Sequence, residues 1–270
     1  MENDRSWCLI LENLLYPFYC QRNMTENFQQ GRLVEKIQAA KDVVILRVSL
    51  PNIQQKKYTA GQFFMLALPD MHNKSGFLVK KAYSVATCCA KHYEDYIEFC
   101  IRYYENGELS PKLARLKVGD TILLDGPYGK FTIDPLTKQN LVLLAGGTGV
   151  APMMGFIRQI LNEQMKNPIL LLYNTKTSKD LLYKTELEEI SNDVSNINVV
   201  FSLTQDGKES GKGSAEKGRI TLAMIKKYCK DKDLNNKEFF ICGPVEMIRE
   251  LKQALLDAGV EKSLIKIDVW

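Results

Sequence analysis

The sequence is poor in the residue types from which most metal centres and hydrolytic sites are built. Its two histidines, His72 and His92, lie in a polar, irregular region, so neither indicates a metal ligand or a catalytic base. Its cysteines number seven, and none forms a CxxC pair or another zinc-ligand spacing. The C-x4-C-x2-C spacing of a plant-type iron–sulfur cluster is also missing. We therefore expect no bound metal.

Long apolar runs are missing as well, and no stretch is long enough to cross a bilayer. The N-terminal run 9–19 is interrupted by Glu12 and Asn13 and lacks a basic start and a small-residue cleavage site, which argues against a secretory signal. Without an export signal, reduced thiols in a cytoplasmic protein are the default expectation. Residues 1–29 are interpreted as an N-terminal arm, either a plain arm or a short amphipathic segment that contacts a membrane or a partner.

Strong charge of either sign is absent, because the net charge is only +4. No cluster of lysine and arginine with interleaved aromatic residues occurs, so binding to nucleic acid is not expected. A mildly basic surface remains compatible with an acidic partner or a phosphorylated cofactor. The length of 270 residues allows one large domain or two of ordinary size.

The first half of the chain has the pattern of an antiparallel barrel or sandwich. Short β-type runs are separated by turn residues, and one short helix is predicted at 111–115. Several short strands at this spacing are typical of all-β domains. The predicted strands are 43–50, 62–68, 82–86, 96–103 and 121–124.

After Asp134-Pro135 the pattern changes to alternating buried strands and amphipathic helices. This alternation predicts a Rossmann-like parallel sheet with helices on both faces. We therefore divide the chain into the arm 1–29, a β-barrel domain 30–135 and an α/β domain 136–270. The predicted strands are 141–145, 169–173, 198–203, 238–242 and 265–269, and the predicted helices 153–161, 181–190, 221–228 and 245–258.

Two glycine-rich turns stand in the second half, at 146–152 and at 242–247, and each lies between a predicted strand and a predicted helix. Small residues after a buried strand let the backbone approach a pyrophosphate, and the helix that follows offers unpaired N–H groups. Ligands of open α/β sheets bind beyond the carboxyl ends of strands, so both turns face one crevice. Together they predict a dinucleotide site with the Cys242 thiol beside it, although an inert buried cysteine is a common alternative.

The segment 81–87, Lys-Ala-Tyr-Ser-Val-Ala-Thr, resembles the flavin motif Arg-x-Tyr-Ser/Thr of the ferredoxin–NADP reductase superfamily. That superfamily includes the cytochrome b5 reductases, and the resemblance extends from about residue 30 to the C-terminus. It implies an FAD-binding barrel followed by a nicotinamide-binding domain. It also implies that Tyr83 packs on the flavin and that the catalytic Ser84 donates to flavin N5. Lys81 replaces the usual arginine at the flavin pyrophosphate and lacks its bidentate fork, a departure that bears on FAD affinity.

Other segments of the first half resemble further flavin-binding elements of the superfamily. One lines the isoalloxazine, a second is a G-x-x-S/T turn that holds the FAD phosphates, and a third is the G-P-x-G-x-F segment at the domain junction. The residues so implied are Ile101, Arg102, Tyr103, Gly107, Glu108, Leu109, Ser110 and Phe131.

In the second half the resemblance implies a pyrophosphate turn and a segment that brings a catalytic thiol to the nicotinamide. The residues concerned are Gly147, Thr148, Gly149 and Pro152, then Cys242, Gly243, Pro244 and Met247. The final residue, Trp270, is interpreted either as a cover for the flavin ring or as a packing plug.

These observations predict hydride transfer from NADH or NADPH to FAD. Because no cluster cysteines are present, electrons must then pass to a separate acceptor, either a heme or iron–sulfur protein or a small molecule such as free flavin or quinone. Lys176 and Lys179 could bind a 2′-phosphate, whereas Asp180 aligns with an acidic residue of NADH-preferring relatives and would repel one. We expect a preference for NADH.

Two alternatives from other classes remain open. The chain is a flavin reductase if it treats flavin as a dissociable substrate. It is a non-catalytic nucleotide-binding subunit if it has lost flavin. The replacement of the motif's arginine by Lys81 would then be the sequence change that accompanies this loss.

Overall fold

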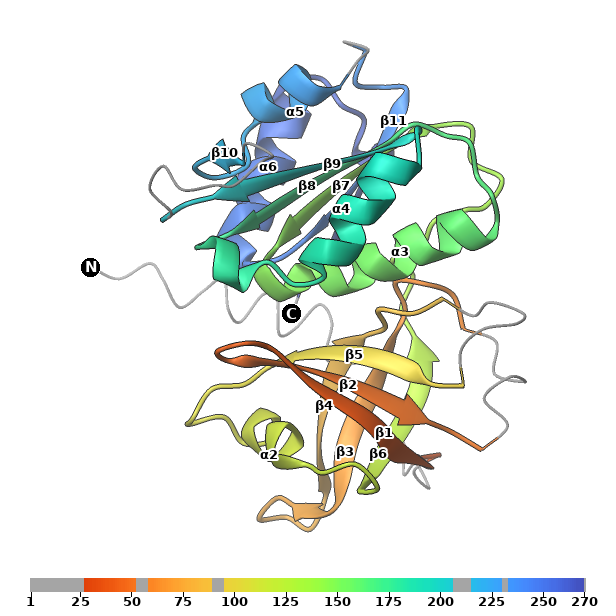
Figure 1. Cartoon of the computed structure of the whole chain (residues 1–270), viewed down its shortest axis with the longest axis vertical. Coiled ribbons are helices and arrows are strands. Elements are labelled where there is room, and N and C mark those ends of the chain that lie inside the picture. The colour runs from red at the N-terminus through yellow and green to blue at the C-terminus, as the bar shows by residue number, and fades with distance from the viewer. Residues whose placement is uncertain (1–26, 52–57, 89–94, 206–214, 230–232, 270) are drawn as a thin grey trace.

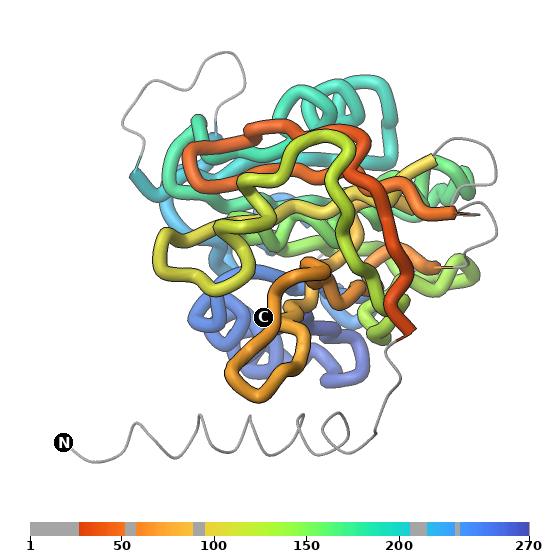
Figure 2. The backbone as a smooth tube through the Cα atoms, turned by 90° about the horizontal axis from the view of Figure 1, so that it is seen from below, coloured from red at the N-terminus to blue at the C-terminus, as the bar shows by residue number. Residues whose placement is uncertain are grey.

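Two sheets of six strands each divide the computed structural model, which describes residues 27–51, 58–88, 95–205, 215–229 and 233–269. The antiparallel sheet forms the lower part of the molecule in Figure 1 and the parallel sheet the upper part. Figure 2, seen from below, shows the strands of the first sheet in front of the second domain. The predicted class, an antiparallel barrel followed by a parallel sheet with helices, is confirmed.

The first sheet has the strand order β4-β3-β6-β1-β2-β5. Its two edges meet where Val85, just after β4, forms an isolated antiparallel bridge with Phe99 in β5, which closes the sheet into a barrel. Apolar side chains such as Leu46 and Phe64 fill the interior. The elements are β1 (Gln29–Ala40), β2 (Val43–Ser49), β3 (Phe63–His72), β4 (Leu78–Ser84), β5 (Ile97–Arg102), α2 (Ser110–Arg115) and β6 (Thr121–Tyr128).

The strand β1 is the largest difference from the sequence prediction, which contains no strand between 30 and 42. Only Gly31 and Leu33 of its twelve residues are buried. The rest of the strand is polar or half-exposed, so its sequence carries little of the apolar alternation that predicts a strand. Its pairing with both β2 and β6, rather than its own composition, holds it in the sheet.

The second sheet is wholly parallel, with the order β10-β9-β8-β7-β11-β12. Its strands are β7 (Asn140–Gly146), β8 (Ile169–Thr175), β9 (Ile197–Leu203), β10 (Glu216–Lys217), β11 (Lys237–Cys242) and β12 (Ile265–Asp268). The helices are α3 (Val150–Asn162), α4 (Lys184–Asp193), α5 (Leu222–Tyr228) and α6 (Val245–Asp257), and the short 3-10 turns are η2 (Gly147–Gly149), η3 (Ser178–Asp180) and η4 (Lys262–Leu264).

Helices cover both faces of this sheet because successive side chains of a strand point to opposite faces. Leu141 and Leu143 of β7 pack in the cluster that contains α3, whereas Val142 and Leu144 pack in the cluster that contains α5 and α6. The helix predicted from residue 181 starts at Lys184 instead. The leucines at 181 and 182 are buried ahead of it, after the turn η3.

The two sheets share one apolar core. Phe131, which follows β6, packs against Phe156 of α3 and Phe240 of β11, with ring centroids 5.4 and 5.6 Å away. Phe156 and Phe240 are 5.1 Å apart. The same cluster includes Val43 and Ile45 of β2. The barrel and the parallel sheet are therefore held at a fixed distance by buried aromatic packing.

Replacement of Phe240 by alanine should destabilise both domains together. The ring is fully buried at the centre of the shared cluster, and loss of a buried phenylalanine costs about 3–5 kcal/mol. Urea unfolding followed by circular dichroism should show one cooperative transition at lower urea. Two separated transitions in the wild-type protein, or a change of less than about 1 kcal/mol in the variant, would contradict a shared core.

Candidate functional site

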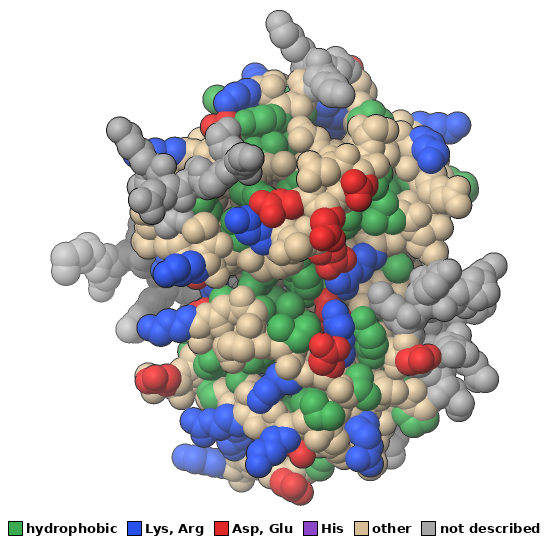
Figure 3. All heavy atoms as spheres, in the orientation of Figure 1, with side chains coloured by type: hydrophobic (Ala, Val, Ile, Leu, Met, Phe, Trp, Pro, Cys, Tyr) green, Lys and Arg blue, Asp and Glu red, His purple; other side chains and the backbone are tan. Residues whose placement is uncertain are grey.

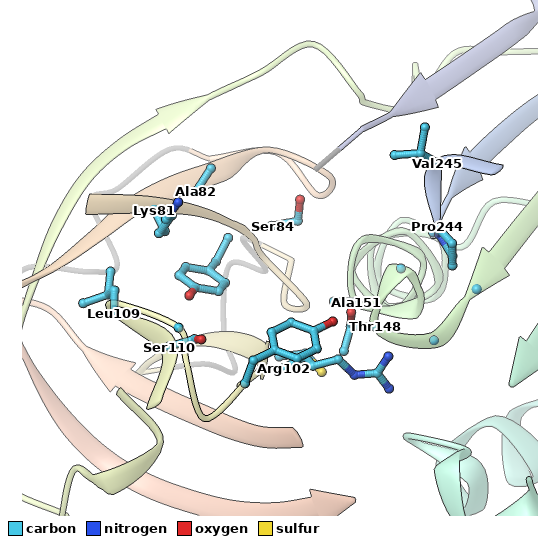
Figure 4. Close-up of a pocket in the computed structure, with 18 of the residues that line it drawn as sticks. Lys81, Ala82, Ser84, Arg102, Leu109, Ser110, Thr148, Ala151, Pro244 and Val245 are labelled. Carbon is cyan, nitrogen blue, oxygen red and sulfur yellow. The ribbon is translucent and has the colours of Figure 1, made fainter. Parts of the chain in front are cut away.

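A cavity of about 600 Å³ lies between the barrel and the parallel sheet. Figure 4 shows that its lining side chains come from both halves of the chain and converge on one space. The barrel contributes Lys81, Ala82, Tyr83, Ser84, Cys100, Arg102, Tyr104, Gly107, Glu108, Leu109 and Ser110, and the parallel domain Gly146, Gly147, Thr148, Gly149, Ala151, Gly243, Pro244, Val245 and Glu246.

The barrel wall is formed by the end of β4 and the turn that enters α2. Lys81 is exposed, whereas Ser84 is buried near the parallel domain. Tyr83 lies between them, and burial raises the pKa of its hydroxyl to about 12, so the ring presents a neutral, largely apolar face to the cavity. A Cβ on Gly107 would lie 2.9 Å from Ser110 Oγ, so this turn closes tightly around its own hydroxyl.

The opposite wall is made by the two glycine turns, which lie against each other although almost a hundred residues separate them. The strands before them, β7 and β11, are parallel neighbours, with Ala145 opposite Cys242. A Cβ on Gly149 would lie 2.2 Å from the carbonyl oxygen of Cys242, and one on Gly243 would lie 3.0 Å from the Cα of Gly146. Only glycines allow this approach, which leaves backbone groups facing the cavity.

A hydrogen bond joins the barrel wall of the cavity to the last strand of the parallel domain. The Ser84 hydroxyl donates to Oδ2 of Asp268, at the end of β12, over 3.1 Å. Burial raises the pKa of the Asp268 carboxyl to about 6, and the Ser84 hydrogen bond opposes that rise. Asp268 also borders a second cavity of about 280 Å³, together with Lys130 and Lys266. An ionisable group with a pKa close to neutrality therefore touches the predicted catalytic hydroxyl.

Sequence reasoning missed Asp268, although a signal for it exists. It stands opposite Cys242 in the pairing of β11 with β12, at the carboxyl edge where ligands of open α/β sheets bind. The last strand was predicted as 265–269, and an acidic residue at its end was the available clue.

Alternation along β5 explains which residues of that strand face the cavity. Side chains of a strand point alternately to opposite faces, so Cys100 and Arg102 of β5 line the cavity, and Tyr104, just after the strand, lines it as well. The predicted Ile101 instead lies fully buried in the barrel core. The predicted Tyr103 also lies outside the lining, and its hydroxyl donates to the carbonyl of Lys41 over 2.9 Å.

Arg102 reaches across the cavity toward the pyrophosphate turn. Its Nη1 lies 3.5 Å from the position that a Cβ on Gly147 would occupy. On the barrel side its Nε lies 3.2 Å from a carboxylate oxygen of Asp42. The arginine that was expected beside the isoalloxazine therefore stands next to the turn predicted to hold a pyrophosphate.

Several other predicted residues lie near the cavity without lining it. Cys242 is fully buried, with its backbone against Gly149. Met247 packs beneath Gly146, where its sulfur would lie 2.7 Å from a Cβ. Pro152 is buried in the first turn of α3, and Phe131 belongs to the shared aromatic core.

The remaining two predicted site residues are Asp180 and Trp270. Oδ2 of Asp180 accepts hydrogen bonds from the backbone N–H of Thr177 over 3.0 Å and from the Thr177 hydroxyl over 2.7 Å. This carboxylate thus caps the turn η3. Trp270 lies outside the described residues.

The residues that line the cavity fit the phosphate groups of a dinucleotide. The cavity has a lysine and hydroxyls on one wall and glycine backbone on the other, as phosphate groups require. Among the residues that the structure describes, no three His, Cys, Asp or Glu side chains are grouped to hold a metal ion. No helix in that part of the chain is long and apolar enough to cross a membrane.

Two family models match the chain, one after the other. The oxidoreductase FAD-binding domain matches residues 30–133 and the oxidoreductase NAD-binding domain residues 143–253. NADH-cytochrome b5 reductase 1 of Scheffersomyces stipitis is 30% identical over 244 residues, which cover 88% of this chain and 81% of that protein. The reductase component of propane 2-monooxygenase from Mycolicibacterium smegmatis is 28% identical and is matched over 58% of its length by 77% of this chain.

A solved structure of the CS-b5R domains of human Ncb5or has the same fold, with a TM-score of 0.78 at 24% identity. The match covers 92% of this chain and 71% of that one. The chain therefore belongs to the ferredoxin–NADP reductase superfamily, as an oxidoreductase that binds FAD and a nicotinamide dinucleotide.

Proposed function

We propose that the cavity holds FAD against the barrel wall and the nicotinamide dinucleotide against the glycine turns, so that electrons pass between them. FAD, when bound, supplies the redox chemistry by accepting a hydride from the nicotinamide at N5. The observation that carries the proposal is the single cavity lined by Tyr83 and Ser84 on one side and by Gly147–Gly149 on the other. The protein contributes alignment of the two ligands and exclusion of water.

Each wall has a separate binding task in this proposal. Lys81 and the turn 107–110 hold the FAD phosphates, and Tyr83 packs on the flavin. Thr148, with the backbone of its turn, holds the pyrophosphate of the nicotinamide dinucleotide, and the proximity of the Arg102 guanidinium to Gly147 supports a role for it there. Pro244 and Val245 complete the wall at the nicotinamide end.

Ser84 and Asp268 act as a pair that controls one proton. Ser84 has a single O–H, so it donates either to Asp268 or to flavin N5. When Asp268 is protonated, the carboxyl donates to Ser84 Oγ and leaves the serine proton free for N5. When Asp268 is ionised, its carboxylate accepts the hydrogen bond of the Ser84 hydroxyl, which is then not available to N5. The pKa of about 6 places this exchange close to neutral pH.

We propose NADH as the preferred donor, which agrees with the names of the cytochrome b5 reductases among its relatives. The repulsion expected from Asp180 is reduced because that carboxylate is engaged by Thr177. The exposed Lys176 and Lys179, in the loop and turn that follow β8, favour a 2′-phosphate. We therefore expect only modest discrimination against NADPH.

The acceptor is a separate molecule, and we propose a heme or iron–sulfur protein. The matched relatives are named as reductases of cytochrome b5 and as the reductase component of an oxygenase, which supports a protein acceptor. We also propose a cytoplasmic location, as expected from the sequence.

A flavin reductase that releases its flavin is the second candidate. Lys81 is exposed and offers a point charge where the superfamily motif has an arginine fork, so retention of FAD is expected to be weaker. Gel filtration of the FAD-loaded protein decides between the candidates, because a tightly held cofactor stays with the protein peak.

Anaerobic mixing of the FAD-loaded protein with NADH should bleach the visible absorbance of the oxidised flavin. The same experiment with NADPH should give a lower kcat/KM, within about tenfold of the NADH value. A flavin that stays oxidised with both donors would contradict the proposed function. A higher kcat/KM with NADPH would contradict only the proposed preference.

The rate of flavin reduction should fall as pH rises through about 6, because ionised Asp268 then competes for the Ser84 proton. Asp268→Asn should remove this dependence and keep the faster rate at high pH, since an amide donates to Ser84 Oγ as the protonated acid does. Ser84→Ala should be slow at every pH, by about tenfold or more. Stopped-flow reduction between pH 5 and 8 measures all three. A rate that rises with pH in the wild-type protein would overturn the assigned proton exchange.

Charge reversal at Lys176 should increase the preference for NADH, because Lys176→Glu replaces attraction to a 2′-phosphate with repulsion. We expect the ratio of kcat/KM for NADH over NADPH to rise by about tenfold at low salt. Lys262→Glu is the matched control, since Lys262 is exposed but stands before β12, whereas Lys176 follows the carboxyl end of β8 in the interior of the sheet. Equal changes in both variants would show that net charge, not this site, controls the choice.

A further inference from the structure

A chain of five charged side chains of alternating sign runs from the barrel into the parallel domain. Its contacts are Arg47 to Glu35 over 2.8 Å, Arg47 to Glu98 over 2.7 Å, Arg158 to Glu98 over 2.9 Å and Arg158 to Glu186 over 2.9 Å. Figure 3, in the orientation of Figure 1, shows acidic and basic side chains next to each other between the two domains, near α4. The bond from Arg158 to Glu98 is the one that crosses between the domains.

Among these five charged side chains, Arg158 makes the largest number of the contacts described. Its Nη1 donates to Glu98 over 2.9 Å and to the carbonyl of Ala86 over 2.8 Å. Its Nε and Nη2 donate to the two carboxylate oxygens of Glu186, each over 2.9 Å. The guanidinium carbon lies 5.5 Å from the centre of the Tyr183 ring. This planar fork fixes α3 relative to α4 and to the barrel at once.

Gly155 makes a second contact on the same face of α3, one turn before Arg158. A Cβ on Gly155 would lie 3.0 Å from the carbonyl oxygen of Val85 and 3.2 Å from that of Thr87. The helix therefore rests directly on the backbone of residues 85–87, and Arg158 holds the middle residue of that segment by its carbonyl. Figure 1 shows α3 lying along the junction of the two domains.

The two segments that meet in this contact, residues 85–87 and α3, each adjoin a wall of the cavity along the chain. Residues 85–87 follow Tyr83 and Ser84 on the barrel wall, and α3 follows the turn η2 on the other wall. A shift of the helix on this segment would change the distance between flavin and nicotinamide. We propose that Arg158 is a positioning residue for hydride transfer: it sets this distance without touching either ligand. This inference rests on the proposed function.

Glu98 makes the contact strong and directional. Its side chain is fully buried. Burial acts to raise the pKa of Glu98, but the charges and hydrogen bonds of Arg158 and Arg47 outweigh it and hold the pKa below the ordinary value. A buried carboxylate that loses one of its two arginines keeps the other, so the barrel can retain its fold while the link to α3 is lost.

Arg47 provides a matched control. It holds the second oxygen of the same carboxylate and is similarly engaged, but its partners Glu35 and Glu98 both belong to the barrel. Arg47→Met and Arg158→Met each remove one cation from Glu98, and only Arg158→Met breaks the bridge between domains. Arg158→Lys keeps the charge and removes the fork, which provides a milder variant if Arg158→Met fails to fold.

The test is the limiting rate constant for reduction of bound FAD by saturating NADH in the stopped-flow, with the Kd of NADH and the FAD content measured alongside. We expect Arg158→Lys to slow reduction by about tenfold and Arg158→Met by up to about a hundredfold, since misplacement by an ångström costs that much. Both should bind NADH and FAD within about twofold of wild type. In Arg47→Met, bound FAD should be reduced at the wild-type rate, even if the melting temperature of this variant falls as far as that of Arg158→Met.

Unchanged reduction in Arg158→Lys, or equal slowing in Arg47→Met and the Arg158 variants, would overturn the positioning role. A loss of NADH or FAD binding that accounts for the slower turnover would overturn it as well. Failure of the wild-type FAD-loaded protein to be reduced by NADH is a different result, because it rejects the proposed function itself.

Discussion

Close packing of the barrel against α3 and the parallel sheet is the constraint on which the rest of this structure depends. Neither domain encloses the cavity by itself, because one supplies Tyr83 and Ser84 and the other supplies the two glycine turns. The aromatic cluster around Phe240 provides the apolar attraction, and directional bonds fix the register. Transfer of a hydride requires its donor and acceptor to be held within van der Waals contact, so the geometry of this junction is part of the chemistry.

Polar contacts across the junction have two distinct tasks. The bond between Ser84 and Asp268 lies at the cavity and involves a group that titrates near neutral pH. The contacts of Arg158 lie behind the cavity wall and involve a carboxylate that stays ionised. We therefore propose that the first contact responds to pH and to the ligand and that the second keeps the two walls at a constant separation.

Local motifs were predictable from the sequence, and contacts between distant segments were not. The glycine turns and the segment 81–84 are short, contiguous patterns, so the fold class and the cofactors followed from them. Asp268 and Ser84 are separated by 184 positions, and no pattern along the chain joins them. Three consecutive residues at the end of β5 and just after it, 101–103, were assigned to the flavin, yet only Arg102 of these lines the cavity. The strand β1 was missed because tertiary pairing, not composition, defines it.

The central claim is that bound FAD takes a hydride directly from the nicotinamide across this cavity. The most direct measurement compares reduction of the FAD-loaded protein by NADH and by NADH carrying deuterium at the transferred position of C4. The account predicts slower bleaching of the flavin with the deuterated donor and a charge-transfer absorbance as the two rings meet. Flavin that is reduced at the same rate by both donors would show that another step limits electron entry, and flavin that is not reduced at all would contradict the claim.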